Sequence, residues 1–424
     1  MTSQRLRILY LSHLPPSPPR FGAQARIHGL MTNLAQRHDL TAISLVDPEF
    51  DLEDCRRAMQ EYCREVILLR NTNARNLSEK RILQIRSLAS FSSFERLLYS
   101  APELQDQLDT LLCRERFDVV NLEFPYLAHL RLRQSPPGAP TPAFVIDTHE
   151  IAYDLVRQFG RNAKTLGRRV YSALDWRKLR REERRAFRSA DGICACSVAD
   201  AGRVREEVPS ARTVVIPNAA DVDYYQPRPS DSPSDGRTVL FFGLMSTLPN
   251  IDAVTWFVRA IWPRIVADRP EARLRILGGH PPQSVRDLAG PRVEVAGFVE
   301  DLRPHLASAT ALVVPLRLGG GTRLKIVEGM AMGKAVVSTT LGSEGIEAVA
   351  GRDILIADEP VAFAASVIRL LDDPTLAQQL GSAARKLAVE RYAWKAAAAT
   401  LERFFREILA ARDAAGSKAG GTKS

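Results

Sequence analysis

The sequence has few cysteines, and they follow no pattern. Five occur among its 424 residues, at Cys55, Cys63, Cys113, Cys194 and Cys196. An odd, scattered set excludes a disulfide framework and contains no CxxC metal pair. We therefore expect a reducing compartment, the cytoplasm, and interpret Cys194 and Cys196 as small buried side chains in a strand.

Long apolar runs are also missing. No stretch approaches the roughly 18 apolar residues that a membrane-spanning helix requires. The apolar run near the N-terminus, "RILYLSHLPP", is short and is broken by His13 and Pro15, which does not fit a signal peptide. The sequence predicts a cytoplasmic protein that is soluble or peripheral at the inner face of the cytoplasmic membrane.

Two familiar nucleotide-binding motifs are absent as well. The chain has no Walker A sequence and no GxGxxG after its first apolar strand. Its net charge of +9 suits a phosphorylated ligand or an acidic membrane face without specifying either. Because the basic residues show neither aromatic interleaving nor a known motif, we expect no nucleic-acid partner.

What the chain does contain is an alternation of apolar strands and amphipathic helices. Buried strands are predicted at residues 7–12, 40–46, 65–69, 117–123, 143–150, 192–197 and 213–218, and again at 238–243, 274–279, 293–299, 311–316 and 334–339. The Pro- and Ser-rich stretch "QPRPSDSPSDGR" separates the two series. Strands that alternate with helices in this way predict parallel sheets with right-handed crossovers.

The predicted fold class is therefore α/β, with two Rossmann-like doubly wound domains that face each other across a cleft. We predict an N-terminal domain at residues 1–222, a linker at 223–237 and a C-terminal domain at 238–394. A helix at 395–410, able to pack back on the N-terminal domain, and a disordered tail at 411–424 should follow.

An arginine-rich stretch, "WRKLRREERRAFR" at residues 176–188, mixes both charge signs at helical spacing. Two interpretations remain open. It is either a solvated helix face with i,i+4 ion pairs or a segment that lies on a membrane surface.

The most specific chemistry lies in "GGGTRLKIVEGMAMGK", which begins at residue 319. Gly319, Gly320 and Gly321 follow an apolar strand, and a helix is predicted from Thr322. Glycines allow a phosphate to approach the backbone, and the amides and dipole of a helix N-terminus attract it. The stretch therefore predicts an anion-binding turn, with a structural glycine turn as the alternative.

Three side chains extend this prediction. Arg323 and Lys325 place positive charge at a helix start, where it would destabilise a helix without a ligand. Glu328 lies six residues after Thr322, about 9 Å along a helix axis. That offset suits an acceptor for ribose hydroxyls, although an ordinary surface glutamate also explains it.

Together these motifs make the sequence resemble glycosyltransferase family 4, the group 1 retaining transferases of GT-B architecture. In the C-terminal half the resemblance rests on "VVPLRLGGGTRLKIVEGMAMGKAVVSTTLGSEGI" and "VAGFVEDL". In the N-terminal half it rests on "PPSPPRFGAQARIHGL", "VIDTHEIAYD" and "VIPNAADVDYY". The forms "GLMSTLPNIDAVTWF" and "GGGTRLKIVE" are most similar to the branch associated with exopolysaccharide gene clusters.

The resemblance implies a hexosyltransferase that moves a sugar from a UDP- or GDP-sugar donor to a glycan or lipid-linked acceptor, with no cofactor. It implies a catalytic role for His149, and we expect Arg323 and Lys325 to be catalytic as well because of their charge beside the glycine turn. Taken alone, His149 is equally well explained as a satisfied histidine at a strand end. The donor-binding residues that the resemblance implies are Gly22, Gly243, Val299, Gly319, Gly320, Gly321, Thr322 and Glu328.

Two departures from the family pattern affect these expectations. The family's Glu-x7-Glu lacks its first acid here, because Gly320 stands eight residues before Glu328. The Arg and Lys that many members carry after the first strand of the nucleotide domain are missing from "GLMSTLPNID". Arg323 and Lys325 are the expected substitutes.

No metal site is expected. Asp221 and Asp223 form an apparent DxD, but they lie in "PNAADVDYY", where Asn and Asp are typical turn formers. Two other functions remain open: a GT-B sugar-nucleotide epimerase, and a non-catalytic protein that binds nucleotide sugars.

Overall fold

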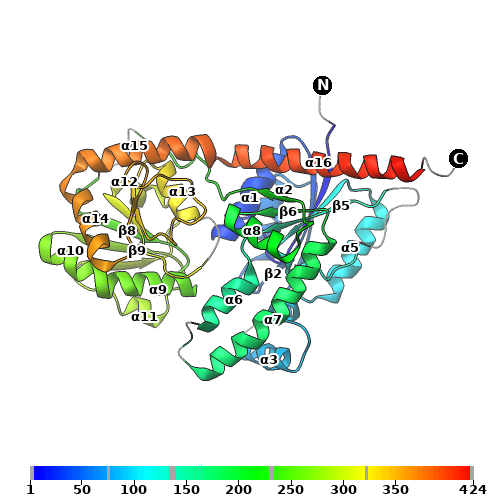
Figure 1. Cartoon of the computed structure of the whole chain (residues 1–424), viewed down its shortest axis with the longest axis horizontal. Coiled ribbons are helices and arrows are strands. Elements are labelled where there is room, and N and C mark those ends of the chain that lie inside the picture. Colours follow the sequence, from blue (N-terminus) through cyan, green and yellow to red (C-terminus); the bar gives the residue numbers. More distant parts are fainter. Residues whose placement is uncertain are drawn as a thin grey trace. The chain divides into compact units, whose positions relative to one another are not determined.

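The computed structural model describes residues 4–73, 77–132, 140–161, 163, 165–228, 234–319 and 323–420. The chain forms two compact units (Figure 1). The first contains residues 1–216 and 398–424, and the second contains residues 217–397. No helix among the described residues is both long enough and apolar enough to cross a membrane.

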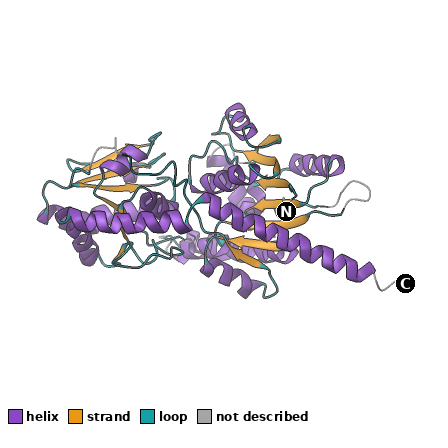
Figure 2. Ribbon diagram, turned by 90° about the horizontal axis from the view of Figure 1, so that it is seen from above, coloured by secondary structure: helices purple, strands orange, loops and turns teal. Residues whose placement is uncertain are grey.

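The first unit is built on a seven-stranded parallel sheet in the order β3-β2-β1-β4-β5-β6-β7. Its strands are β1 (Arg7–Ser12), β2 (Asp39–Val46), β3 (Glu65–Arg70), β4 (Val119–Glu123), β5 (Ala143–Thr148), β6 (Gly192–Ala195) and β7 (Thr213–Val215). The central strands β1 and β4 are buried along almost their whole length because helices cover both faces of the sheet (Figure 2).

The helices of this unit connect the strands in chain order. They are α1 (Gly22–Ala35), α2 (Leu52–Gln60), α3 (Leu77–Leu88), α4 (Phe94–Leu98), α5 (Pro102–Arg114), the 3₁₀ turn η1 (Pro125–Leu127), α6 (Ala152–Arg161), α7 (Leu166–Ser189) and α8 (Val198–Glu207).

The second unit has a six-stranded parallel sheet in the order β10-β9-β8-β11-β12-β13. Its strands are β8 (Thr238–Phe242), β9 (Arg273–Leu277), β10 (Val293–Gly297), β11 (Ala311–Val314), β12 (Ala335–Ser338) and β13 (Leu355–Ile356). Its helices are α9 (Leu248–Trp256), the π-helical turn η2 (Phe257–Ile261), α10 (Trp262–Asp268), α11 (Gln283–Arg286), α12 (Arg303–Ser308), α13 (Leu324–Ala331), α14 (Pro360–Asp372) and α15 (Pro374–Arg391).

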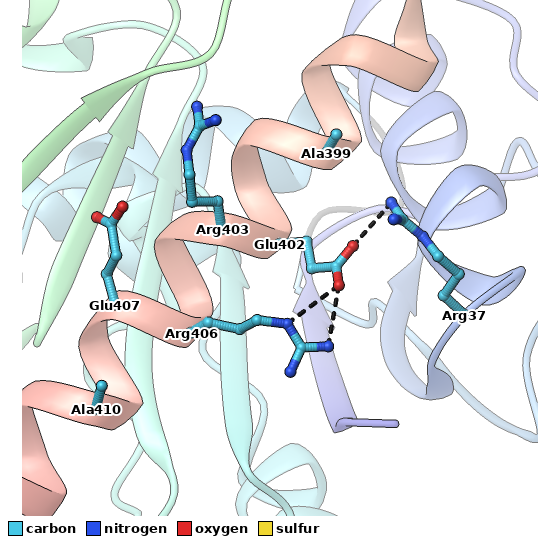
Figure 3. A pocket seen from close by; sticks show the side chains of 7 residues that line it. All are labelled: Arg37, Ala399, Glu402, Arg403, Arg406, Glu407 and Ala410. Atoms are coloured by element: carbon cyan, nitrogen blue, oxygen red, sulfur yellow. Dashed lines mark hydrogen bonds and ion pairs between the residues drawn. The ribbon is translucent and has the colours of Figure 1, made fainter. Parts of the chain in front are cut away.

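The last helix, α16 (Trp394–Gly420), packs on the first unit from residue 398 onward. Its Glu402 forms two ion pairs, one at 2.8 Å with Arg37, which follows α1, and one at 3.0 Å with Arg406 (Figure 3). These side chains line a cavity of about 400 Å³ beside the helix. Because Arg37, Glu402 and Arg406 already pair with one another, we interpret this cavity as part of the contact between α16 and the rest of the first unit.

The predicted fold class is confirmed, while the boundaries differ in detail. The first unit ends at Ile216, before the predicted limit of 222. The helix predicted to end at residue 410 continues as α16 to Gly420, into the segment expected to be disordered. That segment carries several alanines, and Ala is the best helix former, so a helix already nucleated on the protein extends through it.

Candidate functional site

The second unit gathers several of the predicted residues at one point of its sheet. The chain proceeds from β8 to β9 and β10 on one side and from β11 to β12 and β13 on the other. Open α/β sheets bind ligands at such a switch point, beyond the carboxyl ends of the strands. Gly243 follows β8 directly, Gly319 lies in the loop after β11, and α13 begins just beyond that loop.

Lys325 lies in the first turn of α13, and its ammonium reaches the loop that follows β8. Its ammonium donates a 2.7 Å hydrogen bond to Asn250 Oδ1 and lies 4.2 Å from the centre of the Phe241 ring. A Cβ on Gly243 would come within 2.8 Å of Lys325 Nζ, and Gly243 has a φ of +153°. The glycine therefore makes room for the lysine. The Lys325 ammonium thus lies beside the "GLMSTLPNID" loop, from which the cations implied by the resemblance are missing.

The environment of Lys325 is unusual for a lysine. Burial, assisted by the nearby charge of Arg323, lowers its pKa to about 7, while Glu328 acts in the opposite direction. Because burial disfavours its charged form, an anion placed beside this ammonium would stabilise the charge.

Arg323 occupies a position different from the predicted one. It is the N-cap residue of α13, with φ −84° and ψ 103°, and not a residue of the first helical turn. Its guanidinium lies against Gly319, where a Cβ would come within 3.1 Å of both Nη1 and Nη2. The charged groups of Lys325 and Arg323 therefore each lie against a glycine at the switch point. The predicted donor-binding residues Gly320, Gly321 and Thr322 lie outside the described residues.

Glu328 has a partner that the sequence did not indicate. Its carboxylate receives a side-chain hydrogen bond from Tyr225. Burial raises the pKa of Glu328 to about 7, and Lys325 and Tyr225 reduce this effect. Tyr225 lies in the segment predicted as the start of the linker at 223, yet it packs on the core of the second unit. Part of that segment therefore belongs to the site.

The neighbouring residue, Tyr224, connects this segment to the "GFVED" loop. The guanidinium of Arg303 lies 3.9 Å from the centre of the Tyr224 ring and also pairs with Asp301 at 2.7 Å. Val299 lies just beyond β10, and its half-buried side chain packs against the core. β9 separates β10 from β8. A contact from Val299 to a nucleotide base stays a prediction.

One further glycine shapes the switch point. Gly278, directly after β9, has a φ of +151°, and a Cβ there would lie 1.7 Å from the Gly243 carbonyl oxygen. The loops after β8 and β9 can approach this closely only because residue 278 lacks a side chain. The "ILGG" stretch contains the signal, although a glycine after a strand is weak evidence by itself.

The first unit contains a second cluster, centred on His149. This residue follows β5, and its Nε2 lies 2.7 Å from Glu123 Oε2 at the end of β4. Asn121 donates a 2.8 Å hydrogen bond to the other oxygen of Glu123. Burial lowers the pKa of His149, with Arg26 and His13 adding to the effect. Burial and the nearby Asp147 raise the pKa of Glu123, against the influence of Arg26 and Asn121.

Both shifts favour a neutral pair. In that neutral pair the Glu123 carboxyl donates to Nε2 of His149, and the ring hydrogen sits on Nδ1. The carboxyl group thereby sets which nitrogen of His149 is available as a donor.

Arg26 and Asp147 form a fully buried ion pair beneath His149. Arg26 donates from Nε and Nη2 to the two oxygens of Asp147, at 3.1 and 2.8 Å, and from Nη1 to the carbonyl of Ile216 at 2.9 Å. Their side chains are 1% and 0% exposed. Burial opposes the charge of Arg26, but Asp147 more than offsets it and raises the pKa of Arg26.

Glu123, Asp147 and His149 are close enough to hold a metal ion, with ligand atoms within 4.8 Å of one another. Their hydrogen bonds argue against that use. Both oxygens of Asp147 already accept from Arg26, and both oxygens of Glu123 have partners within the cluster. The guanidinium supplies the positive charge that a metal would otherwise provide.

Phe124, directly after β4, is a residue that the sequence analysis missed. It has a φ of +62°, which is uncommon for a residue with a side chain. Its ring lies 3.9 Å from that of His149 and 4.7 Å from that of His13. Burial lowers the pKa of His13 to about 3. The strained backbone thus holds an aromatic ring between two neutral histidines at the β1/β4 switch point of the first sheet.

Two remaining predictions can be located. Gly22 is the exposed first residue of α1, one turn before Arg26. Asp221 accepts hydrogen bonds from the backbone of Asp223 and Tyr224 at 3.1 and 2.9 Å. This is the turn geometry expected of the apparent DxD.

Two family models match the chain. Residues 22–224 match the model described as "Glycosyltransferase Family 4", and residues 236–373 match the model described as "Glycosyl transferases group 1". A curated relative is the "Uncharacterized 44.6 kDa protein in cps region" of Klebsiella pneumoniae, which is 26% identical over 139 residues. The match spans 31% of this chain and 36% of the relative, so the chain covers about a third of that protein's length.

Solved structures resemble the whole chain. Sucrose-phosphate synthase from Thermosynechococcus elongatus is 18% identical and matches with a TM-score of 0.73, over 96% of this chain and 100% of its own. HepE from Anabaena, in complex with UDP, is 16% identical and matches with a TM-score of 0.64, over 95% and 100%. HepE also forms a complex with UDP-glucose. At these identities the likeness shows a shared fold.

Proposed function

The chain belongs to glycosyltransferase family 4 of the group 1 transferases, and on this basis we propose that it is a retaining enzyme that uses a nucleoside-diphosphate sugar. Its two parallel α/β units have GT-B architecture. The acceptor we propose is a glycan or a lipid-linked sugar in the synthesis of exopolysaccharide or another cell-surface glycan. The partial likeness to a protein in a cps region supports that setting.

The observation that carries the proposal is the position of Lys325. Its ammonium lies at the β8/β11 switch point, where burial lowers its pKa to about 7. In this proposal the donor diphosphate pairs with Lys325 and Arg323, and its negative charge returns Lys325 to the fully charged form. The Glu328 carboxylate accepts hydrogen bonds from the ribose hydroxyls, and Tyr225 orients that carboxylate.

These cations also account for catalysis. When the bond between the sugar and the diphosphate breaks, negative charge accumulates on the nucleoside diphosphate, which is the leaving group. Preorganised positive groups that face this developing charge stabilise the transition state more than the ground state. Lys325 packs against Gly243 and donates to Asn250, and Arg323 packs against Gly319. Both cations are therefore already in position, and little reorganisation is needed.

We assign His149 to the donor sugar. Because Nε2 of His149 is occupied by the Glu123 carboxyl, the Nδ1–H of His149 is the group that can donate to a sugar oxygen near the anomeric carbon. Phe124 and the buried Arg26–Asp147 pair fix the position of the ring and of the strand end that carries it. Their role is to position His149.

This assignment predicts different outcomes at Glu123. In Glu123→Gln the amide can still donate a hydrogen bond to Nε2, so kcat should stay within about fivefold of wild type. In Glu123→Ala the ring loses its partner, and kcat should fall about 10²-fold, the lower end of the effect of removing one preorganised donor. Steady-state kinetics measure both. If the Gln variant is as slow as the Ala variant, Glu123 acts as a carboxylate and the assigned tautomer is wrong.

The proposal is tested by a thermal-shift screen of UDP-, GDP- and ADP-sugars. A donor at 100 times its Kd stabilises the protein by about 2.7 kcal/mol, enough to rank donors. HepE binds UDP and UDP-glucose in its structures, which makes UDP-sugars the first choice. Product analysis of the best donor, with and without acceptor, follows. Conversion without acceptor to an epimer would indicate the epimerase, and binding without turnover would favour the non-catalytic alternative that Gly320 leaves open.

We expect activity without a bound metal. Lys325 and Arg323 neutralise the diphosphate in this proposal, and Asp221 is occupied in a turn. Dialysis against EDTA should therefore leave the rate of sugar transfer unchanged within twofold. Loss of activity that Mg²⁺ or Mn²⁺ restores would contradict this expectation.

A further inference from the structure

Large apolar side chains are exposed in an uneven pattern. Among the described residues, seven of the fifteen exposed large hydrophobic side chains come from two short segments of the first unit. They are Ile82, Ile85, Leu88, Phe91, Leu166, Val170 and Leu174. Phe91 is 85% exposed and Leu166 is 76% exposed. Such a concentration is unlike the scattered exposed hydrophobics of an ordinary surface.

The two segments lie side by side because α3 and the turn after it are fixed to α7 (Figure 1). The hydroxyl of Ser87 lies 3.1 Å from that of Tyr171, and Lys178 donates to the Ser87 carbonyl. Arg181 donates to the carbonyl of Phe91. The apolar side chains are therefore displayed on a fixed platform, which we call the α3–α7 face.

The outward side of α7 changes character along its length. Leu166, Val170 and Leu174 follow one another at four-residue intervals. Beyond Leu174 the same helix stripe continues with arginines, spaced three or four residues apart. These are Arg177, Arg181, Arg184 and Arg188, all exposed. One helix surface thus joins an apolar segment to a cationic one.

The ion pairs expected within the arginine-rich stretch are not found. In the described part of the chain, the ion pair that this stretch forms runs from Arg180 to Glu207 on α8. Glu182 and Glu183 accept backbone N–H groups from Ser93 and Ala152 instead. The positive charge of the outward stripe is therefore not neutralised within α7, and the second interpretation of the sequence gains support.

We propose that the α3–α7 face docks the protein on an anionic lipid bilayer. Single apolar side chains on a projecting surface enter the headgroup region without needing a complementary groove, and neighbouring arginines pair with lipid phosphates. The charge complementarity of this face and the net charge of +9 favour lipid over a neutral protein partner. The inference rests on the proposed function only in that docking brings the enzyme to a lipid-linked acceptor.

Vesicle flotation tests the proposal with the full-length protein. Wild type should float with vesicles of equal parts phosphatidylglycerol and phosphatidylcholine, and should not float with phosphatidylcholine alone. Ile85→Ser with Phe91→Ser should weaken binding about tenfold or more through lost apolar burial. Arg184→Gln with Arg188→Gln should weaken it about fivefold for each arginine and reduce its sensitivity to salt.

Matched controls lie elsewhere on the chain. Val198→Ser with Val361→Ser changes two equally exposed apolar residues, and Arg259→Gln with Arg264→Gln changes two exposed arginines. Both should bind vesicles like wild type. Equal binding by all variants, or no binding by wild type, would overturn the proposal. A change in oligomeric mass of the Ser variant would show that the face joins two copies of the chain, which also overturns it.

Donor binding separates this proposal from the proposed function. The face variants should show the wild-type thermal shift with the sugar nucleotide, because they leave the second unit unchanged. Vesicle binding without any donor response would leave the docking surface standing and refute the transferase assignment. A donor response without vesicle binding would leave the transferase assignment standing and refute the docking surface.

Discussion

Replacing Lys325 with methionine is expected to lower kcat/KM for the sugar nucleotide by about 10²- to 10³-fold, the effect of removing one preorganised group from a developing anion. The methionine can still pack on the Phe241 ring, but it removes the charge that lies over that ring and against Gly243. Since the change affects transition-state stabilisation, most of the loss should appear in kcat. Initial-rate kinetics over a range of donor concentrations separate kcat from KM.

Lys386 provides the matched control. It is an exposed lysine on α15 of the same unit, so Lys386→Met removes the same charge at a distance from the switch point. This variant should retain wild-type kinetics. If Lys325→Met is as active as Lys386→Met, the diphosphate does not depend on Lys325.

The low pKa of Lys325 adds a pH dependence. Below pH 7 the ammonium is already charged, and diphosphate binding requires no proton uptake. Above pH 7 the free protein must gain a proton to bind, because an anion raises the pKa of a neighbouring lysine. Affinity for the nucleoside diphosphate should therefore fall as pH rises from 7 to 9, and Lys325→Met should lack this fall. Calorimetric titration at several pH values measures both.

Replacing Asp147 with asparagine is expected to destabilise the first unit by about 3–5 kcal/mol, since the change leaves the guanidinium of Arg26 buried without a counter-charge. Arg26 is 0% exposed and cannot reach water without opening the unit. A loss of this size is a large part of the 5–15 kcal/mol that stabilises a typical domain. Guanidinium chloride unfolding, followed in parallel with activity, measures it.

Asp39 offers the comparison. It pairs with Arg5 at 3.1 Å, but the two side chains are 42% and 57% exposed. Exposed pairs contribute at most about 1 kcal/mol, so Asp39→Asn should shift the unfolding midpoint only slightly. Arg26→Met with Asp147→Asn should recover part of the loss, because no unpaired charge remains. Equal midpoints for Asp147→Asn and Asp39→Asn would contradict the account of this pair.

The sheets could be read from the sequence because parallel strands covered on both faces are continuous apolar runs. β1 and β2 lie where the runs at 7–12 and 40–46 predicted them, and β8 and β11 likewise. β13 escaped prediction because it is only two residues long. Its neighbour β12 supplies the pairing that defines it.

The sites could be predicted only in part. Arg323, Lys325 and Glu328 stood out through charge next to glycine, a local signal. Asn250 and Tyr225 did not, because they reach the site from positions 75 and 103 residues before Lys325 and Glu328 in the sequence. Such contacts arise only when the loops after different strands meet at one edge of the sheet.

The cluster around His149 shows the same limit. "DTHE" pointed to His149 but not to Glu123, Asp147 or the other residues around it. Arg26 lies 121 residues before Asp147, in a helix whose sequence looks amphipathic and unremarkable in charge. Phe124 is conspicuous only through its backbone angle, which no sequence pattern shows.

The most direct test of the central claim is a crystal structure of the protein with a nucleoside diphosphate. We predict that the diphosphate lies at the carboxyl ends of β8 and β11, within hydrogen-bonding distance of Lys325 Nζ, with the ribose at Glu328. A diphosphate bound elsewhere, with Lys325 still bonded only to Asn250, would contradict the account.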